Sequence, residues 1–184
     1  MAQDSFTSES SARNAMARNV EIKARAGDLA ALATRVAAIA DQGPTEILQD
    51  DTFFRCDAGR LKLRAFSNGS GELIFYRRAN QPGPKESFYI RSPTSEPDKL
   101  RESLALAYGA VGRVRKHRTL FLVGRTRVHL DRVEGLGEFL ELEVVLREGE
   151  RADAGVREAQ RLMEMLAVDP SQLIERAYID LLEH

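Results

Sequence analysis

Cysteine is almost absent from this sequence of 184 residues, which contains only Cys56. A single cysteine cannot form an internal disulfide, and it excludes a cysteine-rich zinc site as well. Scarce cysteine also suits a reducing compartment. We therefore expect a cytoplasmic protein without disulfide cross-links.

Long apolar runs and a surplus of one charge are missing too. No stretch approaches the roughly 18 apolar residues of a membrane span, and the N-terminus lacks the apolar region of a signal peptide. The 27 Lys and Arg residues balance 28 Asp and Glu residues, so no overall field points to nucleic acid or to a membrane surface. We expect neither as a partner.

Charged residues of both signs are abundant by contrast. They make up 30% of the chain, somewhat above the usual quarter, so some of them are candidates for lining a site. The length suits one domain with a well-buried core. Residues 1–17 are polar and rich in Ser without a period. This predicts a disordered tail before a single domain over 18–184.

Turn residues divide the chain into short strands and a few helices. Eight strands are predicted, near 19–25, 47–55, 60–66, 72–78, 86–91, 112–123, 125–133 and 137–146. Four helices are predicted: from the N-cap Asp28 to Gly43-Pro44, from the capping pair Ser95 and Asp98 to Gly109, over 152–167, and over 170–182 after the cap Asp169. Because the strands mostly follow one another as hairpins, we predict an antiparallel α+β domain with helices outside a large sheet or barrel.

The stretch GLGEFLELEVVL, residues 135–146, shows the feature on which the functional prediction depends. Successive side chains of a strand point to opposite faces. The leucines and valine at 140, 142, 144 and 146 therefore form an ordinary core face. Glu141 and Glu143 lie together on the other face, where two carboxylates need a partner.

Other predicted strands carry charges on one face in the same way. The sets are Glu21, Lys23 and Arg25; Lys62 and Arg64; Tyr76 and Arg78; Lys116 and Arg118; and Arg127, His129 and Asp131. One interpretation is a solvent-exposed face, as in most antiparallel sheets. The other is the inside of a closed barrel. Like charges on neighbouring strands repel one another, so a basic cluster across several strands favours an anionic ligand and a cation between them.

A closed barrel would turn these faces into a charged channel. Lys and Arg side chains would hold a polyphosphate by its oxygens. The carboxylates would hold Mg²⁺ or Mn²⁺, because hard cations take oxygen ligands that the phosphates also supply. On this hypothesis Glu141 and Glu143 face a metal ion.

Five short motifs in this order resemble the CYTH superfamily, the triphosphate tunnel metalloenzymes. They are Asn19-Val20-Glu21-Ile22-Lys23, Lys62-Leu63-Arg64, Tyr76-Arg77-Arg78, Lys116-His117-Arg118 and residues 135–143. Tyr178-Ile179-Asp180-Leu181-Leu182 and Gln81-Pro82-Gly83-Pro84-Lys85 are similar to the class IV adenylyl cyclase-like branch. The resemblance covers residues of about 18–182. It departs from the family signature at Asn19, where the first carboxylate is replaced by an uncharged amide.

The resemblance implies an eight-stranded antiparallel tunnel that binds a triphosphate and a divalent metal. The catalytic residues that it implies are Glu21, Lys23, Arg118, Glu141 and Glu143. The residues that it implies for substrate binding are Arg25, Lys62, Arg64, Tyr76, Arg78, Lys116, Arg118 and Arg127. The implied metal ligands are Glu21, Glu141 and Glu143, with Asp131 as either a further ligand or a residue that orients Arg127 or a lysine.

The reaction that we favour is that of a class IV-type adenylyl cyclase, which converts ATP into cyclic AMP and pyrophosphate. The first alternative is a triphosphatase acting on inorganic triphosphate or thiamine triphosphate with water as the attacking group. The second is a non-catalytic binder of polyphosphate or nucleotide, which the replacement at Asn19 motivates. A monomer or a homodimer is compatible with each of them.

Overall fold

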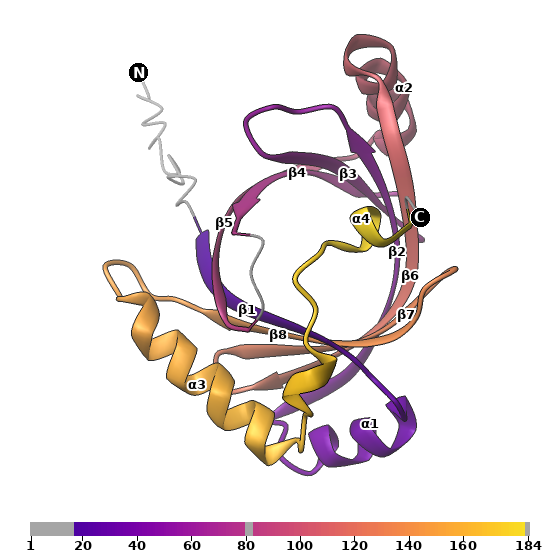
Figure 1. Ribbon diagram of the computed structural model, residues 1–184. Coiled ribbons are helices and arrows are strands. Elements are labelled where there is room, and N and C mark those ends of the chain that lie inside the picture. Colours follow the sequence, from indigo (N-terminus) through magenta and orange to yellow (C-terminus); the bar gives the residue numbers. More distant parts are fainter. Residues whose placement is uncertain (1–16, 80–82, 183–184) are drawn as a thin grey trace, which may run out of the picture.

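The computed structural model describes residues 17–79 and 83–182, which form one closed β-barrel with helices outside it (Figure 1). The strands are β1 Ala17–Arg25, β2 Gln42–Phe54, β3 Arg60–Phe66, β4 Gly71–Arg78, β5 Lys85–Thr94, β6 Ala110–Val123, β7 Thr126–Val133 and β8 Gly137–Val145. All neighbours are antiparallel, and the order around the barrel is β1-β5-β4-β3-β2-β6-β7-β8. The predicted closed eight-stranded α+β architecture is confirmed.

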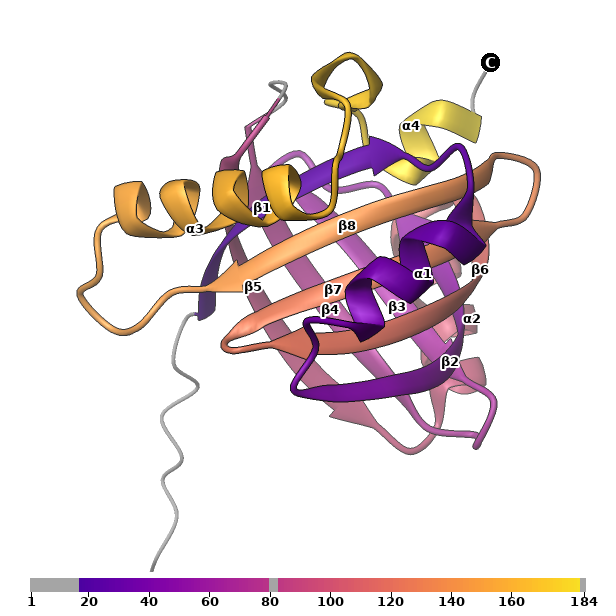
Figure 2. The ribbon, with the colours of Figure 1, turned by 90° about the horizontal axis from the view of Figure 1, so that it is seen from below.

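Four α-helices lie in the described part of the chain: α1 Leu29–Ala37, α2 Pro97–Tyr108, α3 Ala152–Met165 and α4 Tyr178–Leu182. Figure 2 shows α1 and α3 side by side on the outer surface of the barrel. Helix α2 packs beside β2 and β3, and α4 lies at one end of the barrel (Figure 1). In the described residues, no helix is long and apolar enough to cross a membrane.

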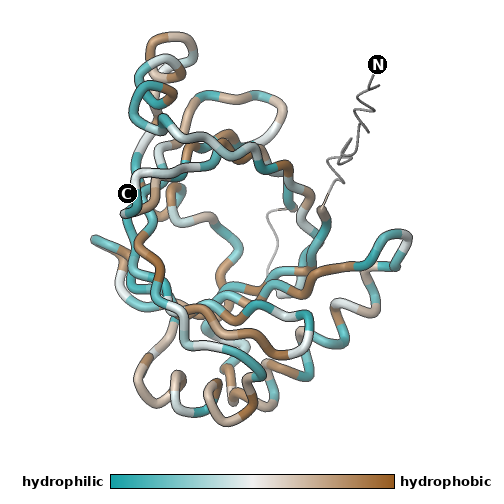
Figure 3. The backbone as a smooth tube through the Cα atoms, turned by 180° about the vertical axis from the view of Figure 1, so that it is seen from behind, coloured by the Kyte–Doolittle hydropathy of each residue, from teal (hydrophilic) through white to brown (hydrophobic). Residues whose placement is uncertain are grey.

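The main hydrophobic core lies outside the barrel, not inside it. The outward faces of β1 and β8 bury Val20, Ile22 and Leu142 completely, and these pack against Leu32 of α1 and Leu162 of α3. Figure 3 shows hydrophilic and hydrophobic residues interspersed along the strands around the ring. Because strand side chains alternate, burying one face under α1 and α3 turns the charged face of the same strands into the barrel.

The first helix is shorter than the sequence predicts. The Asp28 cap is confirmed, since its carboxylate accepts from the amide of Ala31 at 2.9 Å. The helix ends at Ala37, however, and Gly43-Pro44 belongs to β2 instead of marking the end of the helix. Gly43 has a φ of 109°, and a Cβ there would lie 2.7 Å from the carbonyl oxygen of Leu120. Strand β2 therefore needs glycine at this position to approach β6 closely. The interpretation of Gly43-Pro44 as the end of the first helix was wrong.

The predicted capping pair at the second helix is also wrong. The N-cap is Glu96, without a side-chain cap, and Pro97 begins α2. Proline suits the first turn because its missing N–H has no helical partner there. Asp98 pairs instead with Arg101 at 2.6 Å. The predicted end at Gly109 is confirmed.

The last predicted helix is interrupted. Asp169 caps a 3₁₀ turn over Pro170–Gln172, accepting from the amide of Ser171 at 2.8 Å. The chain then leaves the helical path, since Leu173 pairs with Ala24 of β1 and the amide of Ile174 donates to the carbonyl of Lys23 at 2.9 Å. These backbone bonds compete with a continuous helix over 170–182, so that only Tyr178–Leu182 is α-helical. The predicted tail lies outside the described residues, except that Ala17 begins β1.

Candidate active site

A cavity of about 360 Å³ runs inside the barrel. Among the described residues, eight cationic side chains line it: Lys23, Lys62, Arg64, Arg78, Arg91, Lys116, Arg118 and Arg127. Five carboxylates of the same part of the chain line it as well: Glu21, Asp51, Glu72, Glu141 and Glu143. The cations outnumber the carboxylates, so the cavity is built to accept an anion.

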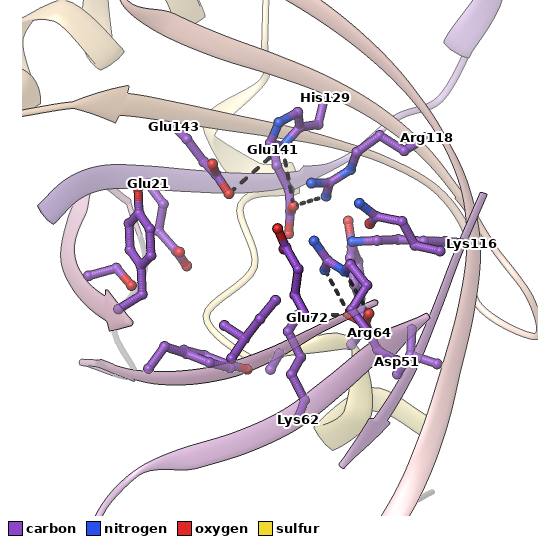
Figure 4. A pocket seen from close by; sticks show the side chains of 18 of the residues that line it. Glu21, Asp51, Lys62, Arg64, Glu72, Lys116, Arg118, His129, Glu141 and Glu143 are labelled. Carbon is purple, nitrogen blue, oxygen red and sulfur yellow. Dashed lines mark hydrogen bonds and ion pairs between the residues drawn. The ribbon is translucent and has the colours of Figure 1, made fainter. Parts of the chain in front are cut away.

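Most of the site residues predicted from the sequence line this cavity (Figure 4). They are Glu21, Lys23, Lys62, Arg64, Tyr76, Arg78, Lys116, Arg118, Arg127, Glu141 and Glu143. Arg78 faces inward with its side chain 2% exposed, whereas Arg77 points outward and donates to the carbonyl of Ala58 at 2.6 Å. The inward and outward alternation of β4 therefore continues regularly through Arg77 and Arg78.

Arg25 does not join the cavity-lining residues. It is the last residue of β1, it is exposed, and its guanidinium donates to the carbonyl of Leu136 at 3.3 Å. It shares the strand face of Glu21 and Lys23 and pairs with Phe139 of β8, but the pairing of β1 with β5 ends four residues earlier, at Glu21. The structure does not support the prediction that Arg25 contacts a substrate.

Asp131 is fully buried outside the lining of the cavity, where it accepts hydrogen bonds from neighbouring side chains. Its two oxygens accept from Arg118 at 2.7 and 2.6 Å. Lys116 at 3.3 Å and the hydroxyl of Tyr178 at 3.0 Å share one of these oxygens. Burial alone would raise the pKa of Asp131, but Arg118 and Lys116 outweigh it and lower that pKa. Of the two predicted roles, the geometry matches orientation of cations: Lys116 is a lysine, as that prediction allowed, and Arg118 takes the place of Arg127.

Asp51 performs the same task on β2, the strand on the other side of β6, and the sequence prediction missed it. It accepts from Arg64 at 2.7 and 2.8 Å and from Lys62 at 2.7 Å. Burial would raise the pKa of Asp51, but Arg64 and Lys62 hold it well below its usual range. The alternation Gln49, Asp51, Phe53 along β2 was the available signal. It was obscured because Asp50 and Asp51 are adjacent, and only one of them can face inward.

Lys62 illustrates how strongly the cations are crowded. Burial, and then the charge of Arg64, lower the pKa of Lys62 to about 7, although Asp51 acts in the other direction. Lys85, which is 1% exposed, lies opposite Glu21 in the β1–β5 register. Burial and the charge of Arg78 lower the pKa of Lys85 to about 8. An anion in the cavity would relieve this crowding.

Glu141 and Glu143 lie at neighbouring inward positions of β8, where each contacts a different set of cations. Glu141 pairs with Lys23 at 2.6 Å and with Arg118. Burial would raise the pKa of Glu141, but Lys23 and the other cations lower it well below the usual range. Glu143 pairs with Arg127 at 3.4 Å. The two carboxylates are thus ionised and available to a cation.

His129 of β7 completes this corner of the cavity (Figure 4). Ligand atoms of His129, Glu141 and Glu143 lie within 4.8 Å of one another. Glu21, which was predicted as a metal ligand, is not in this group, and its carboxylate is paired with Arg78. Two carboxylates beside an imidazole can hold a divalent ion.

Helix α4 covers one end of the cavity. Tyr178 of this helix packs on Phe139, and its ring lies 3.6 Å from Nζ of Lys23. Along β6 the lining extends from Val114 to Leu120, about 20 Å at the usual rise of a strand. Ile47, Phe66 and Leu120 add apolar groups to this lining, and Leu120 lies opposite His129 in the β6–β7 register. Apolar side chains therefore lie among the charged ones.

A closed antiparallel barrel with a charged interior is the architecture of a class of tunnel proteins. The family model of the CYTH domain matches residues 17–178. The chain belongs to this family. The adenylate cyclase CyaB of Aeromonas hydrophila is 28% identical over 178 residues, which cover 89% of this chain and 88% of the relative.

Solved structures share the fold. The PH1012 protein of Pyrococcus horikoshii aligns with a TM-score of 0.79 at 20% identity, covering 89% of this chain and 98% of that one. The Hippeastrum protein HpAC1, described as an adenylyl cyclase candidate with a dominant triphosphatase activity, aligns with a TM-score of 0.63 at 15% identity. That match covers 91% of this chain and 95% of HpAC1. At these identities the likeness concerns the fold.

Proposed function

We propose that this protein is a metal-dependent enzyme that binds a triphosphate inside the barrel, and that its reaction is the conversion of ATP into cyclic AMP and pyrophosphate. The observation that carries the proposal is the cavity with eight cations and five carboxylates. A triphosphate supplies the missing negative charge, and guanidinium groups bind phosphate oxygens with two parallel hydrogen bonds.

The buried carboxylates prepare the cations for this ligand. Asp131 of β7 holds Arg118 and Lys116 of β6, and Asp51 of β2 holds Arg64 and Lys62 of β3. Each carboxylate is shared by two cations, so each cation retains donors for a phosphate oxygen. Such fixed donors reduce the reorganisation needed when charge develops on a leaving pyrophosphate.

In the cyclase reaction the 3′-hydroxyl of ATP attacks the α-phosphorus, and the bond to the bridging oxygen of pyrophosphate breaks. Lys62, Arg64, Lys116 and Arg118 would hold the phosphates and stabilise the leaving group. A divalent ion, when bound at Glu141 and Glu143, would neutralise charge on the phosphate oxygens. The apolar side chains Ile47, Phe66 and Leu120 in the lining offer contacts for an uncharged base.

Two observations support the cyclase reaction over the alternatives. The apolar side chains Ile47, Phe66 and Leu120 in the lining suit a ligand with an uncharged part, which ATP has and inorganic triphosphate lacks. The curated relative at 28% identity is an adenylate cyclase. The triphosphatase alternative uses the same cations with water as the attacking group on the terminal phosphorus, and the activity described for the Hippeastrum structure motivates it.

The test is a product assay with the purified full chain. ATP, inorganic triphosphate and thiamine triphosphate are incubated separately with Mg²⁺ or Mn²⁺, and products are separated by chromatography. Cyclic AMP and pyrophosphate from ATP are expected. Orthophosphate from inorganic or thiamine triphosphate without cyclic AMP would replace the cyclase by the triphosphatase. Tight binding without any product would favour the non-catalytic binder.

A further inference from the structure

We propose that the imidazole of His129 is a direct ligand of the metal ion in the tunnel, and that it makes this site prefer Mn²⁺ over Mg²⁺. The inference deepens the proposed function and rests on it only in taking the tunnel as a metal site. His129 would add a nitrogen ligand to the carboxylates that the sequence indicates, and this ligand would favour one class of divalent ion.

The first observation is the position of Nδ1 of His129. The residue is 4% exposed, and Nδ1 is buried without a hydrogen-bond partner. A buried polar atom without a partner is costly. Nδ1 lies 3.8 Å from Oε2 of Glu141 and 3.8 Å from Oε1 of Glu143, beyond hydrogen-bond distance from both (Figure 4). It is therefore directed at two carboxylates that it does not bind.

The second observation is that these spacings suit a shared ion. Ligand atoms on opposite sides of a small divalent cation are about 4.2 Å apart, twice a bond of about 2.1 Å. The three ligand atoms here lie within 4.8 Å of one another. One ion between them would satisfy Nδ1 and both carboxylates after small side-chain movements.

The third observation is how the carboxylates divide their contacts. Glu143 turns Oε2 to Arg127 and Oε1 to His129. Glu141 turns Oε1 to Lys23, while its Oε2 contacts Arg118 and faces His129. An ion at His129 could therefore bind one oxygen of each carboxylate while Lys23 and Arg127 stay in place, if Arg118 releases Oε2 of Glu141 and keeps its two bonds to Asp131.

The nitrogen donor sets the preference among ions. Mg²⁺ takes oxygen ligands and gives up its waters reluctantly. Imidazole suits first-row transition ions, and Mn²⁺ is the member of that series that also accepts carboxylates and phosphates readily. A site of two carboxylates and one imidazole should therefore bind Mn²⁺ more tightly than Mg²⁺.

The experiment uses the full chain, freed of metal with a chelator, and Mn²⁺ alone as the probe. Electron spin-echo envelope modulation of bound Mn²⁺ should show the nitrogen signal of a coordinated imidazole. His129→Gln should abolish that signal. Loss of a group that only supports a metal ligand already costs about 10–100-fold in affinity, so we expect calorimetry to show at least such a loss for Mn²⁺ and a smaller one for Mg²⁺.

Two further variants sharpen the result. His117→Gln is the matched control, because His117 lies on the outer face of β6 beside Glu46 and should leave the signal unchanged. His129→Asp supplies an oxygen ligand at the same position and should retain metal binding while shifting the preference toward Mg²⁺.

Three outcomes would overturn the proposal: no Mn²⁺ binding to the wild-type chain at millimolar concentration, no nitrogen signal in the wild type, or a signal that persists in His129→Gln. Thermal unfolding of the metal-free variants checks that they fold. Because no triphosphate is present, a failed product assay would leave this result unaffected, and the reverse also holds.

Discussion

At the scale of single residues, Asp131 should matter for both stability and activity. It is fully buried and accepts from Arg118, Lys116 and Tyr178. Asp131→Asn would leave two buried cations short of a counter-charge, and breaking a buried pair in this way costs about 3–5 kcal/mol. We expect that loss in urea unfolding, together with a lower kcat/KM for the triphosphate that is turned over.

The matched control is Asp50→Asn on the outer face of β2. Asp50 pairs with Arg113 at 2.5 Å, but both side chains are partly exposed, 27% and 46%. Exposed pairs contribute about 0–1 kcal/mol. Equal losses for the two variants would show that the Asp131 network is not specially important.

Lys62 makes triphosphate binding depend on pH. Its pKa of about 7 results from burial and from Arg64 and Lys116, against the opposing charge of Asp51, while the Tyr76 and Phe53 rings flank it. A bound polyanion favours the protonated form and raises this pKa. Above pH 7 binding must therefore take up a proton, and affinity should fall as pH rises from 7 to about 9.

Calorimetry of inorganic triphosphate in buffers of different ionisation enthalpy measures that proton uptake. Lys62→Arg keeps the positive charge at every pH in this range, so the variant should lose most of the uptake at pH 8. Equal uptake by the variant and the wild type would assign the proton to another group.

Lys62 also makes the stability of the ligand-free protein depend on pH. Between its folded pKa of about 7 and its unfolded value of 10.5 the unfolded state binds more protons. This group alone therefore makes the ligand-free protein more stable as pH rises through that window. Triphosphate affinity and ligand-free stability should consequently change in opposite directions above pH 7.

At the scale of elements, α4 is held at its end of the barrel by close contact with β6. A Cβ at Gly112 would lie 2.4 Å from Cδ1 of Ile179. Gly112→Val should therefore displace α4 and cost about 1–3 kcal/mol, as overpacking usually does. Hydrogen exchange should show faster exchange in residues 178–182.

Gly27→Ala is the control for this prediction. No atom of the described residues lies within 4 Å of a Cβ built at Gly27, so this variant should match the wild type in stability and in exchange at α4. Unchanged exchange at α4 in Gly112→Val would mean that Ile179 yields without moving the helix.

At the scale of the whole molecule, the excess of cations in the tunnel should make a triphosphate a stabilising ligand. Any ligand that binds the folded state alone adds about 2.7 kcal/mol at 100 times its Kd. For a chain of this size that corresponds to a rise in Tm of roughly 5–10 °C. Inorganic triphosphate with Mn²⁺ should produce this shift, and removing the metal with a chelator should reduce it.

Orthophosphate at the same concentration is the control ligand, because it engages fewer of the cations along the tunnel. A scan of thermal unfolding by fluorescence compares the two. If orthophosphate raised Tm as much as triphosphate, the tunnel would recognise single phosphate groups, and the expected selectivity for a triphosphate would be wrong.

Alternation along the strands was enough to predict which side chains share a face, whereas the closed eight-stranded tunnel was implied by the resemblance to the CYTH superfamily. The period of two in β1, β3, β6 and β8 places Glu21, Lys62, Arg118 and Glu141 on one face without knowledge of the neighbours. Alternation does not show how far the neighbouring strands extend, and the prediction for Arg25 fails for that reason. Arg25 has the right face but lies beyond the part of β1 that pairs with β5, and only the length of the neighbouring strand decides that.

What the sequence determined by itself is which side chains share a face, because that follows from local backbone geometry. What only the tertiary structure decided is which faces meet across the barrel. Asp51 reaches Lys62 and Arg64 through the β2–β3 register, and His129 reaches Glu141 through the β7–β8 register. Strand pairing joins residues that are distant along the chain, so partners and ligand sets of this kind depend on closure of the sheet, which no local pattern encodes.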